Sequence, residues 1–152
     1  MTGMTRLYLD KCCLGRTLED PTQDRVRLEA EAITTIMRHV EAGELLWVGS
    51  NVLDAENEAD SDEDRKAKIS AMFALLDSHV TLDYEDMERA LELSALGFGQ
   101  FDAYHVAAAE KASCDVLLTT DDRFLKTAQR NASKLKVKVC NPVDFLMWKM
   151  TS

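Results

Sequence analysis

The sequence predicts an α/β fold in which helices cover both faces of a parallel sheet. Short apolar segments alternate along the chain with longer segments whose apolar residues recur every three or four positions. This alternation is typical of parallel α/β sandwiches with right-handed crossovers. The length of 152 residues suits one sheet with its helices. We therefore expect a single domain over residues 1–152.

The first elements are a strand, a helix and a second strand. Leu7-Tyr8-Leu9 is a short apolar run that stops at Asp10, and the polar residues 15–23 after it read as a loop. Residues 45–48 form a continuous apolar run between glycines, as expected of a strand covered on both faces. Between them, apolar residues spaced three and four apart predict a helix, with the stripe Val26, Ala30, Ile33, Met37 and Val40.

The later elements continue the same alternation. Gly97 and Gly99 end one helix, and Pro142 is favourable at the first position of another. In chain order we expect a helix over 51–59, a helix restarting at the acidic run 60–64, a strand over 79–82, a helix over 84–96, an alanine-rich helix opened by Asp102, a strand over 116–118, a helix over 123–130, a strand over 135–140 and a closing helix from Pro142.

Composition narrows the class of protein. No apolar run approaches the roughly 20 residues of a membrane span, and the N-terminus lacks a signal-peptide pattern, so we expect a cytoplasmic protein without membrane contact. The four cysteines form no metal-ligand pairs and are expected to be buried thiols. A net charge of −9 argues against an extended nucleic-acid-binding surface. It does not exclude a metal-dependent nuclease, because clustered carboxylates themselves add negative charge.

Three aspartates stand where one edge of the sheet is predicted. Asp10 follows the first strand, Asp102 opens the alanine-rich helix, and Asp121 follows the fourth strand. A helix of about 12 residues descends roughly 18 Å and the next strand climbs back a similar distance, so Asp102 and Asp121 should lie at the same height. That height is the carboxyl edge, where ligands bind in open parallel sheets. Glu56, on the helix leaving the second strand, is a fourth candidate.

Carboxylates so close together would repel unless a cation neutralised them. Mg²⁺ or Mn²⁺ prefers oxygen ligands and is commonly held by one or two direct carboxylates with several waters. A hydroxyl of Thr120 or Ser50 would hold a ligand water or a carboxylate. The competing interpretation is that Asp102 and Asp121 only cap helices. Asp10 is least open to that interpretation, since no helix is expected directly after it.

For two polar residues near these acids we expect a structural role rather than a catalytic one. We expect His105 to be a packed or hydrogen-bonded helix residue rather than a ligand or base, and Asp122 to be a spare acid or a cap. The segment from Arg123 to Lys138 has six basic residues and no acid. Either it is a solvated face, or it forms a basic lip that guides a phosphate backbone.

Four motifs together resemble the PIN-domain ribonucleases, particularly the VapC-type toxins of toxin–antitoxin pairs. The matching residues, in order, are Tyr8-Leu9-Asp10 with Cys12 and Arg16, then Ser50 with Glu56, then Phe101-Asp102-Ala103-Tyr104-His105 with Ala107-Ala108, and finally Leu118-Thr119-Thr120-Asp121. The resemblance implies a five-stranded parallel sheet in a three-layer α/β/α sandwich. It also implies a metal-dependent endoribonuclease that leaves a 5′-phosphate and a 3′-hydroxyl, and a small antitoxin partner that blocks the acidic pocket. A homodimer is left open.

Two other classes compete with the nuclease. An inactive PIN-like module would keep the fold and bind RNA or protein without cleavage, although the presence of all four acids speaks against it. A receiver-like phosphoacceptor also gathers acids above a parallel sheet. That class expects an acidic pair after the first strand and a lysine after the last, whereas Lys11 follows Asp10 and Asn141 follows the last strand.

Overall fold

The computed structural model describes residues 3–151 and contains a five-stranded, fully parallel sheet. Its strands are arranged in the order β3-β2-β1-β4-β5. They comprise β1 (Arg6–Leu9), β2 (Leu46–Ser50), β3 (Ser78–Val80), β4 (Val116–Leu118) and β5 (Lys138–Cys140). The predicted α/β class with a five-stranded parallel sheet is therefore confirmed, although the strand expected over 135–140 pairs only in its second half.

Helices connect the strands and form the two outer layers. They are α1 (Lys11–Arg16), α2 (Asp24–Glu41), α3 (Asn51–Glu58), α4 (Glu63–Met72), α5 (Met87–Ala95), α6 (Gln100–Lys111), α7 (Asp122–Arg130) and α8 (Pro142–Thr151), with short 3₁₀ turns η1 (Phe73–Leu75), η2 (Tyr84–Asp86) and η3 (Ala132–Lys134). Within residues 3–151, no helix is long and apolar enough to cross a membrane.

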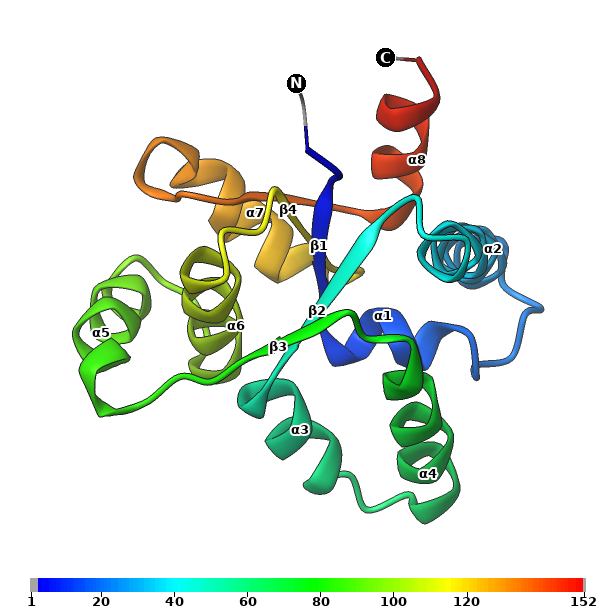
Figure 1. Cartoon of the computed structure of the whole chain (residues 1–152), viewed down its shortest axis with the longest axis horizontal. Helices are drawn as coiled ribbons and strands as arrows, with labels where there is room; N and C mark the ends of the chain where they lie inside the picture. Colours follow the sequence, from blue (N-terminus) through cyan, green and yellow to red (C-terminus); the bar gives the residue numbers. More distant parts are fainter. Residues whose placement is uncertain (1–2, 152) are drawn as a thin grey trace.

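Alternating strand side chains supply the two halves of the core. Leu7 and Leu9 of β1 face the layer that contains α1, α2, α4 and α8, whereas Tyr8 between them faces α6 and α7. Figure 1 shows these two helical layers on opposite sides of the sheet. All three side chains are fully buried, as expected for a strand with both faces covered.

The strand order reverses next to β1, and this reversal marks the edge of interest. The chain passes from β1 to β2 and β3 on one side and then returns to place β4 on the other side of β1. Leu9 is paired with Leu118, so β1 and β4 end at the same level. In open α/β sheets, ligands bind at the carboxyl ends of the strands beside such a switch point. Asp10 and Asp121 follow these two strands.

One local expectation about the acids was wrong, and one helix boundary differs by two residues. A six-residue helix, α1, begins directly after β1, and Asp10 is its N-cap. The sequence did not reveal this helix because six residues are too few to show a helical repeat of apolar residues. Asp102 does not open α6 but lies in its first turn, after an N-cap at Gly99 that makes no side-chain hydrogen bond. Capping therefore explains Asp10 in part and does not explain Asp102.

Candidate active site

Asp10 is a buried carboxylate without an ion-pair partner among the described residues. Its side chain is held by the backbone N–H of Cys13, which lies 3.2 Å from Oδ1, and by the Cys12 thiol, whose Sγ lies 2.9 Å from the same oxygen. Burial raises the pKa of Asp10 well above its usual range, and the charge of Cys12 acts in the same direction. The fold thus keeps an acid at the end of β1 where its ionised form is unfavourable.

The pKa of Asp102 is affected by the charges of the other three acids. This pKa is raised to about 6, mainly by burial and then by the charges of Asp10 and Asp121, with a smaller effect from Glu56. No salt bridge within residues 3–149 involves Asp102. The other three acids predicted from the sequence, Asp10, Glu56 and Asp121, are therefore close enough to Asp102 for each to disfavour its ionisation.

Asp121 caps α7 with a single oxygen. Its Oδ1 accepts hydrogen bonds from the backbone N–H groups of Arg123 and Phe124, at 2.9 and 3.3 Å. Within the described residues no hydrogen bond uses Oδ2. The capping and metal-binding interpretations are therefore compatible, since the cap fixes the carboxylate and leaves one oxygen for a ligand.

Glu56 reaches the region from α3. Its Oε1 lies 3.0 Å from Nε2 of His105, and about a quarter of the Glu56 side chain is exposed. His105 is fully buried and hydrogen-bonded, which confirms the expected role of that residue. Asp122 instead forms a two-oxygen ion pair with Arg25 at 2.8 Å, so it is engaged outside the acidic cluster.

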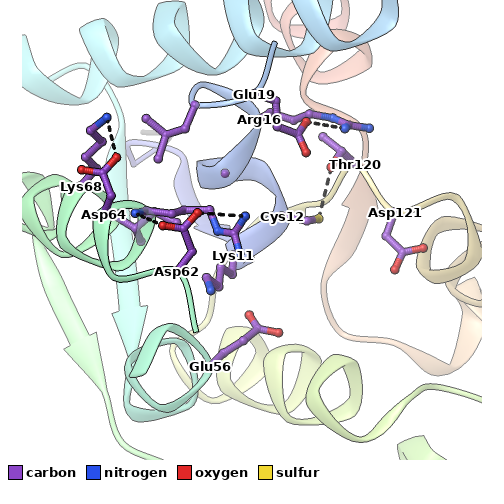
Figure 2. Close-up of a pocket in the computed structure, with 14 residues that line it drawn as sticks. Lys11, Cys12, Arg16, Glu19, Glu56, Asp62, Asp64, Lys68, Thr120 and Asp121 are labelled. Atoms are coloured by element: carbon purple, nitrogen blue, oxygen red, sulfur yellow. Dashed lines mark hydrogen bonds and ion pairs between the residues drawn. The ribbon is translucent and has the colours of Figure 1, made fainter. Parts of the chain in front are cut away.

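A cleft of about 660 Å³ opens beside these acids, with Glu56 and Asp121 among its lining residues. Figure 2 shows Glu56 reaching in from α3 and Asp121 from the start of α7, with α1 and α4 forming the rest of the wall. Four basic side chains line that wall, and each is already in an ion pair: Lys11 and Arg65 with Asp60, Arg16 with Glu19 and Glu29, and Lys68 with Asp64.

The carboxylates of the site suit a hard divalent cation only if water supplies most of its ligands. Among the described residues, no group of three or more His, Cys, Asp or Glu side chains is arranged to hold a metal ion. A cage of direct protein ligands is therefore not preformed. The all-oxygen set of Asp10, Asp102 and Asp121, with uncompensated charge, fits Mg²⁺ or Mn²⁺ held by one or two carboxylates with water completing the shell.

The hydrogen-bond partners of Thr120 and Ser50, and the exposure of Cys12, differ from those expected from the sequence. Thr120 Oγ1 lies 3.2 Å from Cys12 Sγ rather than on a carboxylate, and Ser50 bonds the N–H of Leu53 and the hydroxyl of Tyr8. Cys13 and Cys114 are buried as predicted, but Cys12 is exposed. Hydrogen bonding with Cys13 lowers the pKa of Cys12 to about 6. Sequence reasoning placed Tyr8 in the first strand and the first motif but missed the hydrogen bonds of its hydroxyl to Ser50 and His105.

Comparison with known proteins identifies one matching protein family and structures with a similar fold. The family model described as "PIN domain" matches residues 7–130. A chain in the crystal structure of VapBC2 from Rickettsia felis, bound to a DNA fragment from their promoter, has 12% identity and a TM-score of 0.56, covering 90% of this chain and 98% of that one. PAE2754 from Pyrobaculum aerophilum has 15% identity and a TM-score of 0.51, covering 97% and 90%. At these identities the two structures show a shared fold. No curated protein matches significantly.

Proposed function

The chain belongs to the PIN-domain family, and from this premise we propose that it is a Mg²⁺- or Mn²⁺-dependent endoribonuclease that hydrolyses RNA phosphodiester bonds. The observation that carries the proposal is the pair of Asp10 and Asp102, whose pKa values are raised by burial and, for Asp102, by neighbouring acids. Perturbed acids beside a cleft are typical of functional sites. The proposed site consists of Asp10, Glu56, Asp102 and Asp121.

The proposed cation would be held mainly by Asp10, Asp102 and Asp121. When bound, it supplies a more acidic water and neutralises charge on the phosphate. The protein contributes acids that are oriented in advance. Backbone N–H groups at two helix starts hold Asp10 and Asp121, and His105 holds Glu56. Such preorganisation lowers the cost of arranging charge around the reacting phosphate.

The finer proposal is that this enzyme is the toxin of a type II toxin–antitoxin pair in the cytoplasm. The fold it shares with a chain of the VapBC2 complex supports this reading. Its partner would be a small antitoxin protein that covers the cleft beside Glu56 and Asp121 and so blocks access to the acids.

One observation favours a second candidate, an inactive PIN-like module that binds RNA or protein. Within residues 3–149 the acids do not form a preassembled group of three metal ligands. A module that had lost its metal would keep the fold and cleft but would have no reason to keep buried acids without ion pairs. We therefore rank it second.

The deciding experiment compares two adjacent aspartates. Wild-type protein is incubated with end-labelled RNA and Mn²⁺, and the expected products carry a 5′-phosphate and a 3′-hydroxyl. Asp121→Asn should lower the cleavage rate by about 10²-fold or more, because the charge facing the cleft is lost while Asn keeps the cap. Asp122→Asn is the matched control, since Asp122 pairs with Arg25, and its rate should stay near wild type.

Addition of EDTA should stop cleavage, and excess Mn²⁺ should restore it. Equal rates for wild type and Asp121→Asn, or cleavage that survives EDTA, would contradict the proposed site. A wild-type protein that binds RNA without cutting it would favour the inactive module.

A further inference from the structure

A buried chain of hydrogen bonds ends at Glu56. Ser50 at the end of β2 lies 2.6 Å from the hydroxyl of Tyr8, and that hydroxyl lies 2.6 Å from Nδ1 of His105. Nε2 of the same ring lies 3.0 Å from Oε1 of Glu56. Ser50, Tyr8 and His105 are each 0% exposed. Four different elements of the fold, β1, β2, α3 and α6, therefore meet in one polar network inside an apolar core.

The chemistry of the end groups fixes the direction of these bonds. An ionised carboxylate only accepts, so Nε2 of His105 donates to Glu56. In a ring that carries its hydrogen at Nε2, Nδ1 accepts, which requires the hydroxyl of Tyr8 to donate. Tyr8 accepts from Ser50, whose Oγ in turn accepts from the N–H of Leu53 at 3.0 Å. In the opposite direction, the hydroxyl hydrogen of Ser50 would find no acceptor among the hydrogen bonds of residues 3–149.

Glu56 needs such support more than the other anchored acids. Asp10 and Asp121 are held by backbone N–H groups at the starts of α1 and α7. Glu56 has a longer side chain, lies within α3 and is partly exposed to the cleft, and its one hydrogen bond in the described structure is the bond to His105. Without it, the carboxylate would sample several rotamers and lose side-chain order.

The ring of His105 is itself held in place. Its centroid lies 5.4 Å from that of Tyr8 and 6.4 Å from that of Phe101. His105 also follows Asp102 by three residues in α6, and residues at this spacing share one face of a helix. One turn of α6 thus supplies an acid of the site and the group that holds a second acid.

We propose that His105 is a positioning residue that fixes the carboxylate of Glu56 at the cleft, and that Tyr8 and Ser50 hold its ring in the Nε2–H form. The inference rests on the proposed function for its consequence in catalysis. Its geometric part, the donor at Nε2 and the acceptor at Nδ1, concerns the free protein and can be tested separately.

The catalytic part is tested by a double-mutant cycle. His105→Leu should lower kcat by about 10–100-fold, the range for residues that orient a functional group, with KM little changed. His105→Gln, which keeps a donor, should recover part of that loss. In a Glu56→Gln background, His105→Leu should cost less than about threefold, because the group it orients has already been altered.

A purely structural role predicts a different result. His105→Leu would then lower the rate equally in both backgrounds, and His105→Gln would bring no recovery; either finding would overturn the proposal. Tyr8→Phe is a milder variant for use if His105→Leu does not fold, because it removes only the hydroxyl. It should lower kcat in wild type and have little effect in the Glu56→Gln background. An equal loss in both backgrounds would again overturn the proposal.

The geometric part is tested by NMR on metal-free wild-type protein. Long-range ¹H–¹⁵N spectra at pH 7.5 should show His105, assigned by its loss in His105→Gln, as a neutral ring protonated at Nε2. Tyr8→Phe should shift the Nδ1 resonance, and Glu56→Gln the Nε2 resonance. An Nδ1–H ring, or no response to either substitution, would overturn the proposal. These spectra remain informative even if wild-type protein cleaves no RNA, so failure of the proposed function is distinguishable.

Discussion

Two buried aspartates near the start of α1 have opposite electrostatic environments. Asp60, 9% exposed, lies 2.6 Å from Lys11 and 2.6 Å from Arg65. Asp10, 4% exposed, accepts hydrogen bonds from the backbone N–H of Cys13 and the thiol of Cys12 and has no ion-pair partner among the described residues. Hydrogen bonds from Arg65 and then Lys11 lower the pKa of Asp60 far below its usual range, whereas burial raises that of Asp10.

The difference separates an acid whose charge is paired within the protein, Asp60, from the acid that we propose to bind the cation, Asp10. The charge of Asp60 is neutralised within the chain and joins α1 to the start of α4. The burial of Asp10 is not offset by an ion pair within the described residues, and the charge of Asp10 helps to raise the pKa of Asp102. A fold keeps such an unfavourable arrangement when a ligand compensates it, which is why strongly perturbed acids concentrate at active sites.

The largest expected effect comes from neutralising the two acids in turn. Asp10→Asn should lower RNA cleavage by about 10²-fold or more while the protein stays folded, since Asn still caps α1. Asp60→Asn should lower the melting temperature, because Lys11 and Arg65 lose their shared partner, yet leave cleavage at 25 °C within a few-fold. Cleavage rates and thermal melts of both variants measure this. A large loss of cleavage in Asp60→Asn, with cleavage by Asp10→Asn unchanged, would mean that Asp60 and not Asp10 belongs to the active site.

A smaller effect is expected from adding metal to the free protein. At 100 times its Kd, Mn²⁺ should stabilise the fold by about 2.7 kcal/mol, which for a chain of this size raises the melting temperature by about 5–10 °C. The rise should be lost in Asp10→Asn and kept in Asp60→Asn. An unchanged rise in Asp10→Asn would place the cation elsewhere in the protein.

The smallest effect is the pH dependence that Asp102 imparts. Its pKa of about 6 in the folded protein exceeds the unfolded value of about 3.9. The stability contributed by the protonated form is therefore fully present below about pH 4 and is lost as pH rises through about 6. The melting temperature of the metal-free protein should fall between pH 5 and pH 7, and Asp102→Asn should flatten that fall.

Asp122→Asn is the control, since Arg25 lowers the pKa of Asp122 and no change in the slope of melting temperature against pH is expected in this range. An unaltered slope in Asp102→Asn would reject the assignment.

Sequence alone could locate the acids because their position follows from topology. An acid that ends an apolar strand lies at the carboxyl edge of the sheet whatever the side chains around it do, and Asp10 and Asp121 are both of this kind. Asp102 was predicted at a helix start and does lie in the first turn of α6, although that helix begins two residues earlier, at Gln100.

Contacts between distant residues could not be read in the same way. Tyr8 and His105 are 97 positions apart, and their bond depends on the register of β1 and on the rotation of α6. The pairing of Asp60 with Lys11 likewise requires α1, a helix too short for the sequence to reveal. The three-residue spacing of Asp102 and His105 was the one available signal that the histidine belonged beside the acids.

The most direct measurement of the central claim is an anomalous difference map from crystals soaked in Mn²⁺. We expect a peak among the carboxylates of Asp10, Asp102 and Asp121, with one or two of them as direct ligands and water completing the shell. The ion pairs of Asp60 should show no peak. A crystal saturated with Mn²⁺ that shows no peak among those three acids would contradict the account.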